Sequence, residues 1–276
     1  MLPVLLLAGL LAQAPPRQLL IVGPTLHQFE DGPRIYSDHR YVPGETVFFS
    51  FQVRGYAVTP GDEKKVRLTW RIDALDAAGV RLVEETKGEV DTVVFPEDKD
   101  WAPKVRYSVL IPPHAGAGDY RLVAFVKDEV GLQTVTGVIT FPVQARAIEP
   151  SDTLVVRNFR FLRSEQDTQP LTPASYHVGD SLWAKFDITG FRIAEKNRFK
   201  VSYGISILTA DGKLLFSQEE AAVDEGAPFY PKRHVPAVVS LTIQPGTPAG
   251  EYVMRVTVRD ELGAQSCETK QYFRVE

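Results

Sequence analysis

The sequence predicts an all-β protein built from two similar halves in tandem. Three observations support this: apolar and polar residues alternate along several segments, one pattern occurs twice along the chain, and glycine and proline number 20 each. Alternation with a period of two is typical of strands with one buried face, and frequent Gly and Pro favour turns. No segment has the 3.6-residue apolar spacing of an amphipathic helix.

The alternation predicts corresponding strands in each half. In the first half, it covers residues 47–53, 65–74 and 120–126, and in the second half residues 182–188, 201–207 and 252–258. Burying the apolar face of such a strand stabilises it by about 1.5–3 kcal/mol per large side chain. Asp128 to Gly131 separates two alternating runs and predicts a hairpin loop.

The repeat indicates a duplicated domain. Tyr41-Val42-Pro43-Gly44-Glu45 recurs as Tyr176-His177-Val178-Gly179-Asp180, an offset of 135 residues (176 − 41). The same offset pairs Val66 with Val201, Ile72 with Ile207 and Asp76 with Asp211. Further along, Tyr120 pairs with Tyr252 and Asp128 with Asp260, an offset of 132 (252 − 120). We therefore expect the length difference to lie in the middle loop of each copy.

About seven short strands in each copy, separated by turns, predict two antiparallel β-sandwiches, at residues 18–144 and 153–276. The short connector between them carries Pro150, which favours halves that abut with limited freedom. Tyr120 and Tyr252 each follow a Gly-acid pair at the start of the penultimate predicted strand. This is the position of a tyrosine corner, whose hydroxyl bonds back to the preceding loop.

Residues 1–14 predict a secretory signal peptide and hence an exported protein. An apolar run from Leu2 to Leu11 precedes Ala12-Gln13-Ala14, a small-x-small cleavage pattern. The run is too short to span a bilayer core, which needs about 20 residues. The alternative is a buried N-terminal strand or helix.

The order of these features resembles the immunoglobulin-like modules of exported bacterial proteins. Each copy has Tyr-x-x-Gly-acid, then an apolar-Gly-aromatic step, then Gly-acid-Tyr leading into a strand that ends in Asp. The pattern is also similar to the macroglobulin-type and bacterial proteinase-inhibitor β-sandwiches. The resemblance runs from about residue 18 to the end and rests on scaffold positions, such as Gly44, Gly55, Tyr120 and Asp128. It implies an adhesive, scaffolding or binding role, and no thioester motif Cys-Gly-Glu-Gln is present.

The composition and motifs argue against several other functions. A net charge of −4 is of the wrong sign for a dedicated nucleic-acid binder. The five histidines lack the spacing of a metal site, so we expect no metal or cofactor. The single cysteine, Cys267, aligns with Val135 and is expected to be a buried, unreactive thiol. No Gly-x-Ser-x-Gly elbow is present, and the acidic clusters lie in predicted turns, so we expect no enzymatic activity.

Aromatic residues in two proline-stiffened middle loops are the candidate binding site. They are Phe95 and Trp101 in the first copy, and Phe229 and Tyr230 in the second. Such side chains suit protein or sugar recognition because they lose little entropy on binding. The alternative is that these loops fold back and close the end of each sandwich.

These features together predict a non-catalytic exported module that binds a protein or a cell-envelope polysaccharide, in the periplasm or at the cell surface. A secreted proteinase inhibitor and a carbohydrate-binding module are alternatives from the same setting. A carbohydrate hydrolase would need a carboxylate pair, which strand ends could bring together. No stable membrane span is expected after residue 14.

Overall fold

The computed structural model describes residues 18–98 and 100–276, so the predicted signal peptide lies outside the described residues. The described chain is all-β, with fifteen strands and one short 3₁₀ turn at Glu195–Asn197. All strand pairings are antiparallel except the one between β15 and β9. Within this part of the chain, no helix is long and apolar enough to cross a membrane.

The N-terminal half contains two sheets around one hydrophobic core. The first sheet has the order β1-β2-β5 and the second β4-β3-β6-β7. The strands are β1 (Leu20–His27), β2 (Thr46–Arg54), β3 (Lys65–Leu75), β4 (Thr86–Val93), β5 (Lys104–Leu110), β6 (Gly118–Asp128) and β7 (Thr134–Val143). Alternate residues of both sheets, such as Phe51 and Leu122, enter a single buried cluster.

The C-terminal half repeats this arrangement around a second core. Its sheets have the orders β13-β10-β8 and β12-β11-β14-β15-β9. The strands are β8 (Val155–Leu162), β9 (Ser175–Tyr176), β10 (Ser181–Thr189), β11 (Phe199–Thr209), β12 (Leu214–Gly226), β13 (His234–Thr242), β14 (Gly250–Asp260) and β15 (Gln265–Val275). Residues such as Phe186 and Met254 form the second buried cluster.

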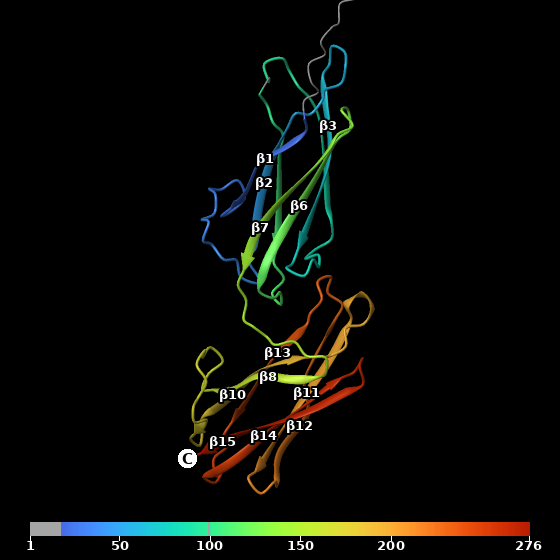
Figure 1. Cartoon of the computed structure of the whole chain (residues 1–276). Helices are drawn as coiled ribbons and strands as arrows, with labels where there is room; N and C mark the ends of the chain where they lie inside the picture. Colours follow the sequence, from blue (N-terminus) through green and yellow to red (C-terminus); the bar gives the residue numbers. More distant parts are fainter. Residues whose placement is uncertain (1–17, 99) are drawn as a thin grey trace, which may run out of the picture.

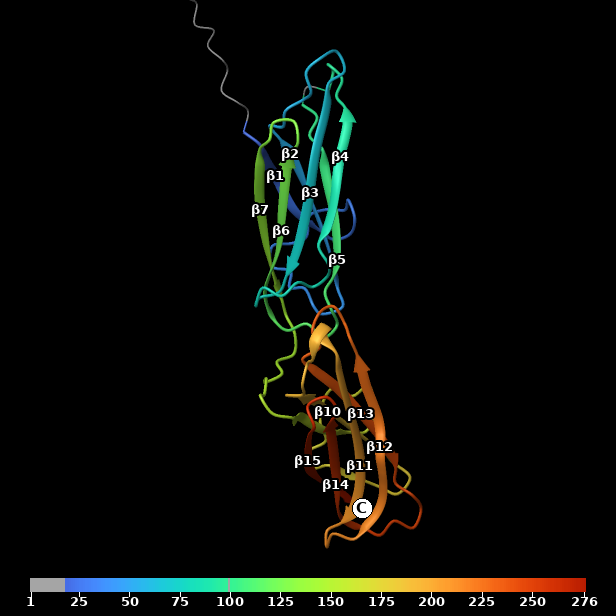
Figure 2. The ribbon, with the colours of Figure 1, turned by 90° about the vertical axis from the view of Figure 1, so that its right-hand side faces the viewer.

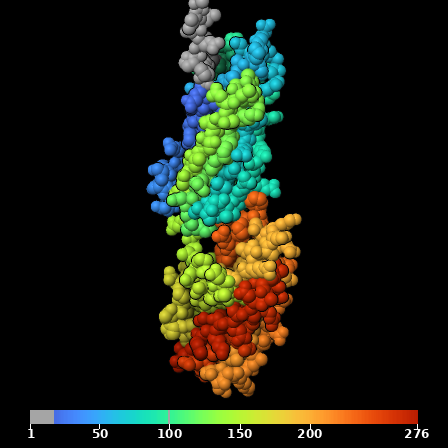
Figure 3. Space-filling view, turned by 45° about the vertical axis from the view of Figure 1, so that its right-hand side comes forward, coloured from blue at the N-terminus to red at the C-terminus, as the bar shows by residue number. Residues whose placement is uncertain are grey.

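The two halves lie end to end (Figures 1 and 2). In each half, one end carries the turn that follows β3 or β11, at residues 76–80 and 209–213. We call this end the turn end. The opposite end, with the β4–β5 loop or the β12–β13 loop, is the loop end. The turn end of the N-terminal half meets the loop end of the C-terminal half, and the space-filling view shows them in contact (Figure 3). Within the described part of the chain, the first loop end and the second turn end do not meet the other half, and we call them free.

The strand pairing corrects one part of the predicted alignment. Asp128 pairs with Leu68, whereas Asp260 pairs with Val201, so Leu68 corresponds to Val201, an offset of 133 (201 − 68). The pairings of Val66 with Val201, Ile72 with Ile207 and Asp76 with Asp211 are wrong by two residues. A slip of two leaves every side chain on the same face, so the apolar pattern could not reveal it.

The slip arises in a loop that was predicted to have equal length in both copies. The Thr59 amide donates to the Lys65 carbonyl, while in the second half the Ala194 amide donates to the Arg198 carbonyl. The second loop is therefore two residues shorter, because it closes over four residues (198 − 194) instead of six (65 − 59). The length difference is not confined to the middle loop.

Both tyrosine corners are present as predicted. The Tyr120 hydroxyl donates to the Gly116 carbonyl at 2.7 Å, and the Tyr252 hydroxyl donates to the Pro248 carbonyl at 2.6 Å. Each ring is buried at a turn end beside the last strand of its half. The corners therefore tie the loop before β6 or β14 to its strand in the same way in both halves.

A buried carboxylate organises both loop ends. Asp128 accepts hydrogen bonds from the Val130 and Gly131 amides at 2.9 Å each and from the Ala57 amide at 2.7 Å. Asp260 accepts equivalent bonds from the Leu262, Gly263 and Arg192 amides. These bonds close the predicted β6–β7 hairpin and attach it to the segment after β2, because a carboxylate with several main-chain donors is a strong acceptor.

Candidate functional site

The structure divides the four predicted binding residues between two places. Phe95 and Trp101 lie in the β4–β5 loop at the free loop end of the N-terminal half. Phe229 and Tyr230 lie in the β12–β13 loop, where the two halves meet. Phe95 and Phe229 are 57% and 48% exposed, and Trp101 is 39% exposed, but Tyr230 is only 7% exposed. The four residues therefore do not form one surface.

Phe95 and Trp101 line a hollow of about 640 Å³ at the free loop end. Tyr56 braces this loop, because its hydroxyl donates to the Trp101 carbonyl at 2.8 Å and the two rings meet edge to face at 6.2 Å. The Phe95 amide donates to the Asp98 carboxylate at 3.3 Å. The loop thus presents two aromatic side chains from a conformation that its own contacts support.

The rim of this hollow is charged. Its lining includes the acidic residues Asp62, Asp98 and Asp100 together with Arg54 and Lys64. Carboxylates accept hydrogen bonds from sugar hydroxyls or peptide amides, and the aromatic rings supply apolar area. The hollow therefore combines the two kinds of group that a recognition site needs.

Tyr230 has a different position, inside the junction. Its hydroxyl donates to the Asp76 carboxylate of the N-terminal half at 2.8 Å, and its ring belongs to the N-terminal hydrophobic core. Asp76 also accepts the Val80 amide at 2.7 Å, and the His114 ring bonds the Tyr230 carbonyl at 3.1 Å. Burial raises the pKa of Tyr230 well above its ordinary value of 10.0, so the phenol keeps its proton. Tyr230 therefore fastens one half to the other.

The connector is held to the C-terminal half by a second polar contact. Arg146 forms an ion pair with Asp187, whose side chain is only 1% exposed, and Asn158 donates to the other oxygen of Asp187 at 2.9 Å. Burial lowers the pKa of the neighbouring His234. A hollow of about 660 Å³ remains between the halves beside these groups. Two polar contacts therefore hold the junction: Tyr230 with Asp76 between the halves, and Arg146 of the connector with Asp187 of the C-terminal half.

A serine–histidine pair escaped the sequence reasoning because its members lie on different strands. His27 on β1 contacts the Ser50 hydroxyl at 2.8 Å through Nε2 and the Gly32 carbonyl at 2.8 Å through Nδ1. The geometry is that of a base oriented next to a hydroxyl. Ser50, however, is buried, and the adjoining cavity measures only about 100 Å³. It leaves no room for a substrate, so the pair acts as an internal hydrogen bond.

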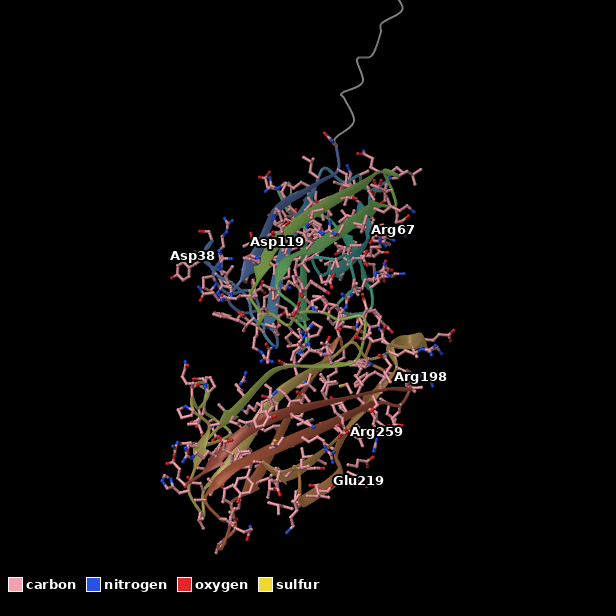
Figure 4. The ribbon with its side chains drawn as sticks, turned by 60° about the horizontal axis from the view of Figure 1, so that its bottom comes forward. Asp38, Arg67, Asp119, Arg198, Glu219 and Arg259 are labelled. Carbon is pink, nitrogen blue, oxygen red and sulfur yellow. The ribbon has the colours of Figure 1, made fainter. Side chains whose placement is uncertain are left out.

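Two further sequence expectations concern chemistry. Cys267 lies on the core side of β15 and is half-buried instead of fully buried, and burial raises the pKa of its thiol. In the described part of the chain, no group of three or more His, Cys, Asp or Glu side chains is placed to hold a metal ion. Charged side chains such as Arg67, Asp119 and Arg259, which are labelled in Figure 4, are exposed.

Comparison with known proteins gives distant structural likenesses. No protein-family model and no curated protein sequence matches the chain. The C-terminal domain of the Streptococcus agalactiae AgI/II polypeptide BspA is similar at 9% identity and a TM-score of 0.31, covering 92% of this chain and 99% of that one. Native Escherichia coli alpha-2-macroglobulin is similar at 10% identity and a TM-score of 0.29, over 95% of this chain and 17% of that one. Both TM-scores are low, so these likenesses carry no functional conclusion.

Proposed function

We propose that the chain is a non-catalytic exported binding module, made of two tandem immunoglobulin-like β-sandwich domains at residues 18–144 and 153–276. The proposal rests on one observation: Phe95 and Trp101 are held exposed on a braced loop at the free loop end. In a soluble module, large aromatic side chains kept on the surface by internal contacts favour a binding role.

The contacts that hold Phe95 and Trp101 support a recognition role because they reduce the conformational entropy lost on binding. Tyr56 contacts Trp101 through both its hydroxyl and its ring, and Asp98 contacts the Phe95 amide. Residues that such contacts already hold in place lose less conformational entropy when a partner docks. The carboxylates of Asp62 and Asp100 at the rim would then fix the orientation of the partner.

The pinned junction supports a presenting role for the rest of the molecule. The Tyr230–Asp76 and Arg146–Asp187 contacts limit bending between the domains. A stiff pair of domains holds its free loop end at a defined distance from its C-terminus. We propose a protein or cell-envelope polysaccharide as partner, in the periplasm or at the cell surface, and no catalytic step.

The test is capture of envelope components by the immobilised chain. We expect Phe95→Ala/Trp101→Ala to lose a component that the parent retains, because the variant removes both exposed rings. Tyr36→Ala is the matched control, since Tyr36 is also an exposed aromatic, 75% exposed, at a different site. Phe229→Ala tests separately whether the junction loop contributes.

Equal capture by all variants would contradict the assignment of the site. Turnover of any captured polymer, abolished by changing one or two carboxylates, would contradict the non-catalytic assignment and favour a hydrolase. Stoichiometric inhibition in a panel of proteases, lost in Phe95→Ala/Trp101→Ala, would identify the partner as a proteinase.

A further inference from the structure

The turn ends of the two halves are closed in different ways. In the N-terminal half, Leu82 follows the turn, its amide donates to the Ala74 carbonyl at 2.9 Å, and its side chain is 2% exposed within the core. At the offset of 133 residues, its counterpart is Leu215 (215 − 82). Leu215 is 50% exposed and lies at a register shift of β12, between Leu214, which pairs with Leu208, and Phe216, which pairs with Ile207.

The C-terminal half has an open apolar cleft at this end. The cleft has a volume of about 530 Å³, and its lining includes Leu182, Ile207, Leu241, Ile243, Tyr252 and Phe273. By the same offsets, the first four correspond to Val47, Ala74, Val109 and Ile111, which belong to the buried core that contains Leu82. The leucine that is buried in the N-terminal half therefore lies at the edge of this cleft in the C-terminal half, with half of its surface exposed.

The rim of the cleft carries exposed apolar side chains of its own. Leu214, Leu215 and Phe216 are consecutive in β12, and all three are exposed, although Leu215 and Phe216 also line the cleft. An apolar rim beside an apolar cleft is an unusual surface for an isolated chain. It is also self-complementary, because the exposed apolar side chains at the rim of one copy match the apolar cleft of another copy.

We propose that this cleft and rim form a two-fold symmetric interface between two copies of the chain. Leu215 of each copy enters the cleft of the other, in the role that Leu82 has within the N-terminal half, and the two Phe216 side chains meet at the two-fold axis. An isologous contact of this kind closes on itself and gives a dimer.

The charges beside the rim agree with a two-fold axis at Phe216. Lys213 lies three residues before Phe216 and Glu219 three residues after it, and both are exposed. When two copies of this segment run antiparallel about Phe216, Lys213 of each copy faces Glu219 of the other. Glu219 lies at the margin of the C-terminal half, where a second copy could reach it (Figure 4). An axis between Glu219 and Glu220 would instead bring carboxylates together.

Side chains, and not main-chain pairing, hold this interface. The register of β12 against β11 shifts twice, between Tyr203 and Ile205 and between Ile207 and Leu208, which marks bulges in the edge strand. Bulges hinder the addition of another strand. The matching edge strand of the N-terminal half, β4, exposes Lys87, Glu89 and Asp91, so it has no comparable apolar rim.

The experiment is sedimentation equilibrium of the full chain at concentrations up to about 100 μM, the range for a weak dimer. We expect the mass to rise from 30.7 kDa towards twice that value. Lys213→Glu and Glu219→Lys should each weaken the dimer about tenfold, because each puts like charges opposite each other twice. An equimolar mixture of the two variants should dimerise again, since one copy then has Glu at both positions and the other has Lys.

Leu215→Ser/Phe216→Ser should abolish the dimer, while Leu110→Ser, which changes an exposed leucine in the N-terminal half, should leave it intact. Circular dichroism of each variant confirms that it is folded. A parent chain that stays monomeric overturns the proposal, and so does a mixture of charge variants that stays monomeric. A monomer whose cleft binds a leucine-containing peptide would assign the cleft to a different partner and also overturn it.

Discussion

The two halves share the bonds of a buried carboxylate at their loop ends, whereas a leucine at their turn ends is placed differently. At the loop ends, Asp128 and Asp260 make the same three main-chain bonds. At the turn ends, Leu82 is buried in the core, but its counterpart Leu215 is exposed beside an open cleft. The bonds of the buried carboxylate are therefore the same in both halves, although a nearby loop differs in length by two residues, whereas the apolar packing at the turn ends differs.

The largest loss of stability should come from replacing the glycine that follows β2 or β10. Gly55 and Gly190 have φ values of +75° and +79°, and an added Cβ would lie 1.9 Å from the carbonyl oxygen of Gln18 or Thr153. We expect Gly55→Ala and Gly190→Ala each to lower the free energy of unfolding by about 4 kcal/mol, because main chain must move in addition to the left-handed strain. Urea denaturation measures this loss.

Gly44→Ala is the matched control for these glycines. Gly44 also has a positive φ, +88°, but an added Cβ there would meet nothing within 4 Å. Gly44→Ala should therefore lower the free energy of unfolding by only about 1–2 kcal/mol, the strain of a left-handed residue. Equal losses for Gly44→Ala and Gly55→Ala would show that the close approach of main chain is unimportant.

The two leucines test the difference at the turn ends directly. Leu82→Ala removes a buried side chain and leaves a cavity, so we expect a loss of about 3 kcal/mol in the free energy of unfolding. Leu215→Ala changes a half-exposed side chain and should change that free energy by less than about 0.5 kcal/mol in the dilute, monomeric chain. Comparable losses would mean that Leu215 closes its own cleft in solution.

Tyr230→Phe tests the bond that joins the unlike ends. The change leaves the buried Asp76 carboxylate without the 2.8 Å hydroxyl donor, although it keeps the Val80 amide. We expect a loss of about 1–2 kcal/mol in the free energy of unfolding and larger bending between the halves. Calorimetry and small-angle scattering measure these, and Tyr36→Phe, at an exposed site, is the control. An unchanged scattering profile and stability would contradict the role of Tyr230.

The smallest effect concerns the loop after the first strand of each half. In the N-terminal half, hydrogen bonds from Arg106 and Lys104 lower the pKa of Asp31 from 3.8 to about 2. In the C-terminal half, the Ser164 hydroxyl and main-chain amides lower the pKa of Asp167. Because the folded pKa of Asp31 is depressed, its stabilising contribution is present above pH 3.8 and is lost as the pH falls through 2.

Carboxyl NMR titration at low and high salt separates these two loops. Arg106→Ala should raise the pKa of Asp31 towards its ordinary value, since Arg106 has the largest effect on it. Salt should raise the pKa of Asp31 more than that of Asp167, because salt screens exposed ion pairs more than hydrogen bonds to main chain. Equal salt responses would indicate that both carboxyl groups depend on charge alone.

The sequence was sufficient to predict the main strands and the tyrosine corners, because both depend on residues that lie close together in the chain. Alternation identified β2, β3 and β6 and their counterparts β10, β11 and β14. The Gly-acid motifs located both tyrosine corners, since hydroxyl and acceptor lie only four residues apart. The two-residue slip between β3 and β11 was invisible because it preserves the face of every residue. Only the ladder of hydrogen bonds distinguishes the two alignments.

The candidate site was harder to predict because it depends on which loop end is covered by the other half of the molecule. Trp101 and Tyr230 lie in similar proline-containing loops, yet one loop end is free and the other is covered by the neighbouring half. Nothing in the local sequence of Tyr230 indicates Asp76, which lies 154 residues away. Likewise, Leu82 and Leu215 are the same residue type, and only the path of the chain after the turn separates a buried side chain from an exposed one.

The pinned connector has a mechanical consequence. Eleven residues lie between Val143 at the end of β7 and Val155 at the start of β8, and such a segment reaches about 37 Å when fully extended. The bond of Tyr230 to Asp76 joins the two halves, and that of Arg146 to Asp187 holds the connector against the C-terminal half. Under tension along the molecule, we expect these two contacts to bear load between the halves and to break before either hydrophobic core unfolds, because each is a single polar contact whereas each core is held by many buried side chains.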